Sequence, residues 1–161
     1  MTQPAAGLAV RQTVTVEAPP ERAFAVFTEG LDSWWPLATH AIGAQPAVAV
    51  VVEPRPGGRW YERAADGSEC DWGRVLAWEP PHRLVLAWEI SADWQHDPGL
   101  VTEVEVRFHA EDADRTRVEL EHRGLEAYAD RAGDMRDTFD SPGGWPGLLE
   151  RFAGAAAQGG R

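Results

Sequence analysis

Residues 57–89, GGRWYERAADGSECDWGRVLAWEPPHRLVLAWE, contain three strand-like runs joined by two turn signals. The first signal is Asp66-Gly67, which favours a tight hairpin because such a turn needs a positive φ that glycine adopts freely. The second is Pro80-Pro81, which ends one strand before the next begins, since proline has no N–H to donate to a neighbouring strand. The stretch therefore predicts an antiparallel meander of three strands.

Half of the eight tryptophans fall in this meander: Trp60, Trp72, Trp78 and Trp88. A buried tryptophan removes on the order of 150–250 Å² from water, so these rings need apolar surroundings. We expect them to form the concave wall of a cavity, although they could instead fill the core of a thin sheet. The alternation of apolar and polar residues points Trp60 and Trp88 inward and leaves the directions of the other two open.

More strands are expected on both sides of the meander. Apolar and polar residues alternate over 9–17, 102–108 and 116–122, which is typical of strands with one buried face. Including the meander, we expect strands at 9–17, 47–53, 60–63, 71–78, 83–90, 102–108 and 116–122, with a turn at 111–114 and a loop at 91–99.

Helical spacing appears in two parts of the chain. After Pro19-Pro20, apolar residues recur at helical intervals to Leu31, and residues 32–36 form a second short helix that ends before a proline. Beyond Gly124 the helical period returns over 125–139, and a final helix carries a stripe of Trp145, Leu148, Leu149, Phe152 and Ala156.

This order of elements predicts an α+β fold. A curved antiparallel sheet of six to seven strands would wrap around a long C-terminal helix, with two short helices after the first strand. We expect one domain over residues 1–161, with loose tails at 1–8 and 158–161. A pocket between the sheet and its helix is the default site for a small molecule.

The composition restricts the possible partners. The net charge is −11 and all 15 basic residues are arginine, so neither nucleic acid nor membrane insertion is expected, and Schiff-base chemistry by a lysine is excluded. The single cysteine, Cys70, fits a reducing compartment, and the N-terminus lacks the features of a secretory signal. We therefore predict a cytoplasmic protein.

Several segments together resemble the START-like (SRPBCC) superfamily of helix-grip proteins, and most closely its heat shock protein 90 ATPase activator homologue group. The matching segments cover nearly the whole chain in order: APPERAFAVF at 18–27, WW at 34–35, PGGRWYE at 56–62, DG at 66–67, WGRVLAWEPPHRLVLAW at 72–88, TEVEVRF at 102–108, TRVELEHRG at 116–124 and GGWPGLLERF at 143–152. The resemblance implies a helix-grip fold with a deep hydrophobic cavity that often holds lipids or aromatic, polyketide-like molecules.

The resemblance also implies a range of activities. Some members of the superfamily are cyclases, dehydratases or hydrolases, and the group's name suggests a role in the stress response. In eukaryotic members this domain accompanies a separate chaperone-binding domain. We expect the 161 residues here to hold one domain only, so the resemblance alone is not evidence of chaperone activation.

Three polar residues are candidates for acid–base chemistry. Glu62 shares strand parity with Trp60, so it faces the cavity unless a bulge turns it to the surface. His122 lies on the core face near a strand end, either as a polar group of the pocket or as a structural hydrogen-bonding residue. His40 follows Trp34-Trp35-Pro36 in a loop where the resemblance implies the cavity entrance.

The principal hypothesis is a protein that binds a small apolar, lipid-like or aromatic ligand. One alternative is a cyclase, dehydratase or hydrolase that uses Glu62, His40 or His122 as acid–base groups. A second alternative is an interaction module for a chaperone or other protein. The protein is expected to be a monomer or a homodimer. No cofactor and no metal are expected, because the histidines never occur at ligand spacing. The expected ligand-binding residues are Trp35, His40, Trp60, Glu62, Trp88, Trp94, His122 and Trp145.

Overall fold

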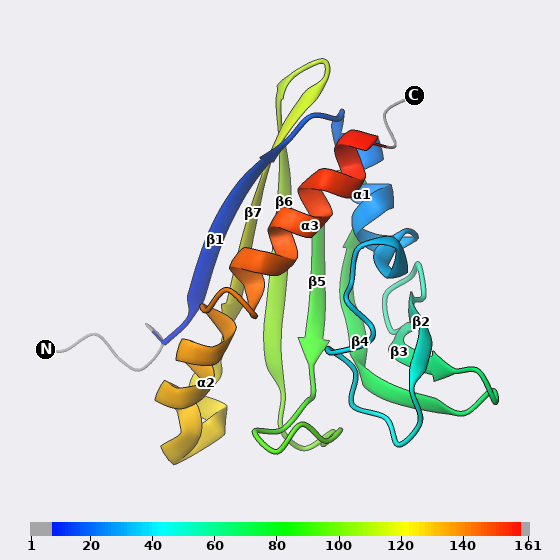
Figure 1. Cartoon of the computed structure of the whole chain (residues 1–161). Helices are drawn as coiled ribbons and strands as arrows, with labels where there is room; N and C mark the ends of the chain where they lie inside the picture. Colours follow the sequence, from blue (N-terminus) through cyan, green and yellow to red (C-terminus); the bar gives the residue numbers. More distant parts are fainter. Residues whose placement is uncertain (1–7, 159–161) are drawn as a thin grey trace, which may run out of the picture.

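The computed structural model describes residues 8–158 and contains a curved antiparallel sheet (Figure 1). Seven strands follow the order β1-β7-β6-β5-β4-β3-β2. Their bounds are β1 Val10–Val16, β2 Ala47–Val52, β3 Arg59–Ala64, β4 Glu69–Glu79, β5 Arg83–Trp88, β6 Thr102–Asp112 and β7 Arg115–Arg123. After β1, which pairs with β7, the strands therefore follow one another as a continuous meander.

Helices cover one face of this sheet. Their bounds are α1 Pro20–Thr28, η2 Leu31–Ser33, η3 Leu125–Arg131, α2 Ala132–Phe139 and α3 Trp145–Gln158. In Figure 1, α3 lies diagonally across the sheet, with α1 beside its C-terminal half and α2 near its N-terminal end. The α+β helix-grip architecture predicted from the sequence is confirmed, including the two short helices after the first strand.

The hairpin between β3 and β4 shows why the meander forms. Gly67 has a φ of 90°, as the turn requires. The Asp66 carboxylate accepts hydrogen bonds from the Ser68 backbone N–H at 2.9 Å and from its hydroxyl at 2.7 Å. The Asp-Gly pair therefore closes the hairpin with local bonds alone.

Several predicted boundaries were wrong. The helical segment expected over 125–139 is not continuous: it consists of η3, which is itself broken at Ala129 with a φ of 56°, followed by α2 from Ala132. The strand expected to reach residue 90 ends at Trp88, and Ile90 forms only an isolated bridge to His96. The tails at 1–8 and 158–161 lie outside the described residues except for Leu8, which packs partly against the core, and Gln158, the last residue of α3.

The convex face of the sheet carries alternating arginine and glutamate side chains. Glu105 is its centre, with Arg83 Nε at 2.6 Å, Arg107 Nε at 2.8 Å and Arg123 also paired to it. Burial alone would raise the pKa of Glu105, but hydrogen bonds from three guanidinium groups outweigh it and lower that pKa to about 2. The polar residues of the alternating strands thus pair across the convex face and leave the concave face apolar.

One end of the concave face is filled with aromatic rings. Phe27 packs edge-on against Phe152 of α3, with ring centroids 5.1 Å apart, and against Phe108 at 6.0 Å. Trp34 lies 5.4 Å from Phe152 and donates from Nε1 to the Val26 carbonyl at 3.0 Å. These contacts join α1, α3 and the sheet into a solid core. Among the described residues, no helix is long and apolar enough to cross a membrane.

Candidate functional site

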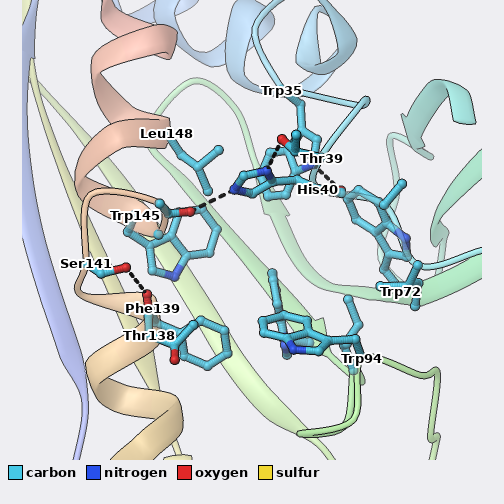
Figure 2. Close-up of a pocket in the computed structure, with 16 residues that line it drawn as sticks. Trp35, Thr39, His40, Trp72, Trp94, Thr138, Phe139, Ser141, Trp145 and Leu148 are labelled. Carbon is cyan, nitrogen blue, oxygen red and sulfur yellow. Dashed lines mark hydrogen bonds between the residues drawn. The ribbon is translucent and has the colours of Figure 1, made fainter.

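The other end of the concave face is hollow. A cavity of about 350 Å³ lies between the sheet, the N-terminal end of α3 and the loop that follows Trp35 (Figure 2). Its lining residues are Trp35, Thr39, His40, Ala41, Ile42, Trp72, Trp88, Ile90, Trp94, Thr138, Phe139, Ser141, Gly143, Gly144, Trp145 and Leu148.

Six of the sixteen lining residues carry tryptophan or phenylalanine rings. Trp35 lies 5.3 Å from Trp72 and 6.0 Å from Trp145, measured between ring centroids. Trp88 lies 5.9 Å from Trp145 and 5.3 Å from Phe139, with the rings near perpendicular. Edge-to-face contacts of this kind stabilise aromatic pairs beyond the area they bury, so the rings hold one another in place around the empty space.

Glu62 holds the loop that forms one side of the cavity. Its Oε1 accepts hydrogen bonds from the Ile42 N–H and from Trp72 Nε1, both at 2.7 Å, and its Oε2 accepts from the Gly43 N–H at 3.0 Å. A Cβ on Gly43 would lie 2.6 Å from the same carboxylate, so any larger residue there would push the carboxylate away from its donors. The carboxylate is 2 % exposed and does not line the cavity; its three donors hold the loop and the Trp72 ring in place.

His40 lies at the mouth of the cavity and bridges its two sides (Figure 2). Its Nε2 is 2.7 Å from the Gly143 carbonyl oxygen, which can only accept, so Nε2 carries the proton. In the neutral ring Nδ1 then accepts from the Thr39 hydroxyl at 2.7 Å. Trp35 Nε1 donates to the His40 carbonyl at 2.9 Å. Among the lining residues, His40 is the one whose side chain carries an acidic or basic group.

His122 lies behind the wall rather than in the cavity. Its Nδ1 accepts a hydrogen bond from Trp145 Nε1 at 3.1 Å, so Nε2 must donate to Thr102 Oγ1 at 2.8 Å. The Thr102 hydroxyl in turn donates to the Trp88 carbonyl at 3.2 Å. Burial lowers the pKa of His122 to about 3, so the ring is neutral at physiological pH. This directed chain of bonds fixes Trp145 and the end of β5.

The structure brings five of the eight predicted ligand-binding residues to the cavity: Trp35, His40, Trp88, Trp94 and Trp145. Three do not line it. Trp60 faces inward but lies behind Trp72 and Trp88, at 5.5 and 5.7 Å between ring centroids. Glu62 and His122 are fully engaged by protein partners. The acid–base candidates therefore do not converge, because only His40 faces the cavity.

Sequence reasoning left the direction of Trp72 open, and a bulge explains why. The pairing of β3 with β4 shifts between Trp60 and Tyr61, so strict alternation along β4 does not hold at Trp72. Trp72 is 1 % exposed and lines the cavity, whereas Trp78 is partly buried and packs on Phe24 at 5.1 Å. The sequence did not predict that residues of the α2–α3 linker line the cavity, because the only distinctive feature of that linker is its glycine-rich sequence.

No group of three or more histidine, cysteine, aspartate or glutamate side chains within residues 8–158 could hold a metal ion. Cys70 is a free thiol, and burial, together with the nearby carboxylates of Glu62 and Asp71, raises its pKa. The chemistry that the cavity offers is therefore apolar contact, one imidazole, the hydroxyls of its threonine and serine residues, and backbone carbonyl groups.

A curved sheet that grips a C-terminal helix over an aromatic-lined cavity defines the START-like class of proteins. The sequence model of the family described as Activator of Hsp90 ATPase homolog 1-like protein matches residues 17–157, and the chain belongs to this family. A comparison with curated protein sequences finds no match.

Solved structures similar to the chain include two with substantial sequence identity. An anthrahydroquino-γ-pyrone synthase, Txn09, is 40% identical over 91% of this chain and 95% of its own, with a TM-score of 0.64. CalC, a self-sacrificing resistance protein from Micromonospora echinospora, is 32% identical over 94% of this chain and 96% of its own, with a TM-score of 0.71. The Aha1 dimer from Colwellia psychrerythraea shares the fold at 15% identity, 94% and 97% coverage and a TM-score of 0.61.

Proposed function

We propose that the protein binds a flat, fused-ring aromatic molecule in the cavity at the N-terminal end of α3. The observation that carries this proposal is the enclosure of about 350 Å³ by tryptophan and phenylalanine rings from four separate parts of the chain. Ligand sites commonly have volumes of about 300–1,000 Å³ with mainly apolar walls, so the space suits one small molecule of a few rings.

The polar groups at the mouth define the rest of the ligand's chemistry. His40 and Thr39 on one side of the mouth, and Thr138, Ser141 and the Gly143 carbonyl on the other, place polar groups beside an otherwise apolar space. No arginine lines the cavity, and the net charge of the chain is −11. A neutral ligand with hydroxyl or carbonyl groups at one edge fits this arrangement better than a carboxylate or phosphate would.

The two relatives with the highest identities quoted above support this class of ligand. One is named for the synthesis of an anthrahydroquino-γ-pyrone, a fused-ring product, and the other is named as a resistance protein. We place binding first, because the cavity contains one titratable side chain rather than an acid–base pair.

Calorimetric titration with 1,8-dihydroxyanthraquinone tests the proposal. Wild type should bind the probe, and Leu148→Trp, which fills the cavity from α3, should abolish binding while the protein stays folded. Leu76→Trp is the matched control, because Leu76 is 37 % exposed on β4 and does not line the cavity. Binding that persists unchanged in Leu148→Trp would place the ligand elsewhere and contradict the proposal.

A second candidate function is catalysis of the cyclase, dehydratase or hydrolase type with His40 as the acid–base group. It is favoured by the identity to the synthase and by the position of His40 at the cavity mouth. Ligands extracted from cells with the protein would be identified by mass spectrometry and then incubated with wild type and His40→Gln. Conversion by wild type only, with binding retained in the variant, would establish catalysis.

The chaperone-associated alternative receives less support. In the described residues the exposed large apolar side chains are few: Val48 lies on β2, Leu76 on β4, and Trp94 and Val101 lie seven positions apart in the connection between β5 and β6. A protein-docking surface usually presents such side chains as one contiguous patch. The similarity to the Colwellia psychrerythraea Aha1 dimer concerns the fold alone, so stimulation of a chaperone ATPase remains the measurement that would favour this alternative.

A further inference from the structure

Trp94 has a backbone conformation that tryptophan rarely adopts. Its φ is 61°, within the left-handed region that favours glycine and asparagine. A bulky residue in that region is strained, and such strain persists only where the surrounding structure imposes it. Strained residues cluster at ligand-binding sites, and Trp94 is one of the residues that line the cavity.

Hydrogen bonds on both sides of Trp94 impose this conformation. The Trp94 N–H donates to the Ser91 carbonyl at 2.9 Å, and the Ser91 N–H donates to the Gln95 carbonyl at 2.8 Å. The buried Glu89 carboxylate anchors the loop through His96 Nε2 at 2.9 Å and Arg74 Nε at 2.8 Å. The loop is therefore fixed to the sheet at its base and closed by a tight turn at its tip.

The strained backbone presents a ring that stays accessible. Trp94 is 44 % exposed, whereas Trp35, Trp72, Trp88 and Trp145 are each at most 5 % exposed. Its one aromatic neighbour within the described residues is Phe139, at 6.3 Å and near perpendicular. In Figure 2, Trp94 lies across the cavity from His40, so the ring has free surface beside the space where a ligand would bind.

We propose that Trp94 is a specificity-determining residue that covers the bound ligand and stacks on its flat aromatic face. The proposal rests on the proposed function and deepens it, because it selects planar ring systems among the apolar molecules that the cavity could hold. The loop holds the ring in place before binding, so little conformational freedom is lost when the ligand arrives. The stronger binding that results explains why a strained tryptophan occupies a position where glycine or asparagine would make the protein more stable.

Three variants of Trp94 test the assignment by calorimetric titration with 1,8-dihydroxyanthraquinone. Trp94→Phe keeps an aromatic ring and should bind within about twofold of wild type, whereas Trp94→Leu keeps apolar bulk without stacking and should bind about three- to tenfold more weakly. Trp94→Asn suits the positive φ and should lose affinity to a similar extent. The melting temperature of Trp94→Asn should be unchanged or higher, because asparagine adopts a positive φ more readily than tryptophan. If Trp94 had a merely structural role, its replacement would lower the melting temperature instead.

The matched control is Val101→Asn, which replaces a side chain that is 36 % exposed and does not line the cavity. It should bind the probe as wild type does. If wild type binds and Trp94→Leu binds equally well, the Trp94 assignment is overturned and the proposed function stands. If wild type does not bind the probe, the proposed function fails and this inference fails with it. A lower melting temperature in Trp94→Asn would show that the loop needs the ring for folding and would also overturn the assignment.

Discussion

The two ends of the concave face contain the same kind of side chain and differ in what the rings enclose. Near α1, Phe108 packs against Phe24 and Phe27, and Phe27 packs in turn against Phe152 of α3, so that the rings fill this end with mutual contacts. Near the start of α3, five tryptophan rings and one phenylalanine ring surround about 350 Å³. Aromatic content therefore does not decide whether a region becomes core or cavity.

Polar bonds account for the difference. The filled end is held mainly by ring packing between α1, α3 and the sheet. At the hollow end, Glu62 holds the 42–43 backbone and Trp72, and His122 holds Trp145. Directional bonds of this kind oppose movement of Trp35, Trp72 and Trp145 into the empty space, because a ring that moved inward would leave a buried donor or acceptor unpaired. Trp88 has no hydrogen-bond partner for Nε1 among the described residues and is held by its ring contacts with Phe139 and Trp145.

Truncation of a ring at the filled end should give the largest loss of stability. Phe152→Ala should lower the free energy of unfolding by about 3–5 kcal/mol, because the removed ring leaves a void among fixed neighbours. Leu148→Ala, one turn earlier on α3, should lower it by only about 2 kcal/mol, since that side chain already faces the cavity. Urea denaturation measures both values, and equal losses would mean that the two ends are packed alike.

Loss of the Glu62 charge should weaken the hollow end alone. Glu62→Gln replaces one acceptor oxygen by an NH₂ group that faces N–H donors, so the free energy of unfolding should fall by about 2–3 kcal/mol. The Trp72 and Ile42 resonances in NMR spectra should shift, while those of Phe27 should not. Glu69→Gln is the control, because Glu69 is exposed and pairs only with Arg59 at the surface.

The fold followed from local signals in the sequence. The Asp66-Gly67 turn, the period of two in β6 and β7, and the apolar stripe of α3 each depend on residues close together in the chain. The cavity depends on partners far apart. Glu62 shares its strand face with Trp60, as the alternation predicted, yet its carboxylate is satisfied by a loop about 20 residues earlier.

Dependence on distant partners also explains why the alternation of apolar and polar residues could not separate the tryptophans that line the cavity from those in the core. Trp60 and Trp88 share the inward direction, but Trp72 covers Trp60, and that arrangement depends on a bulge that strict alternation does not predict. Trp94 gave the opposite result. It lies in the loop expected over 91–99 and was predicted as a ligand-binding residue, and it is one of the residues that line the cavity.

The buried imidazole of His122 should make stability at the hollow end depend on pH. Its pKa is lowered from 6.5 to about 3 in the folded protein, so between these values the unfolded chain binds a proton that the folded chain does not. Stability is therefore complete above about pH 6.5 and falls as the pH falls, by about 2 kcal/mol between pH 6.5 and 4.5. Over the same range His122→Gln should lose less stability than wild type.

The comparison with His122→Gln isolates this residue. The other four histidines contribute equally to both proteins, and Glu105, whose pKa is lowered from 4.5 to about 2, loses its contribution mainly at a lower pH. Urea denaturation at several pH values gives the difference directly. If the free energy of unfolding depends on pH in the same way in both proteins, burial does not keep the His122 ring neutral.

The smallest effect on stability is expected at the mouth, where His40 joins the two sides of the cavity. His40→Ala removes the bond to the Gly143 carbonyl, which water can then reach, so the free energy of unfolding should fall by only about 0.5–1.5 kcal/mol. Association and dissociation rates of 1,8-dihydroxyanthraquinone, measured by stopped-flow fluorescence, should both rise because the bond that spans the mouth is gone. Thr39→Val keeps that bond and removes only the partner of Nδ1, so it should exchange the probe at nearly the wild-type rate. If both variants exchange the probe faster than wild type, the hydrogen bond from His40 to Gly143 is not what limits exchange. The orientation of the imidazole would then matter more than that bond, and the mouth of the cavity would not be closed by it.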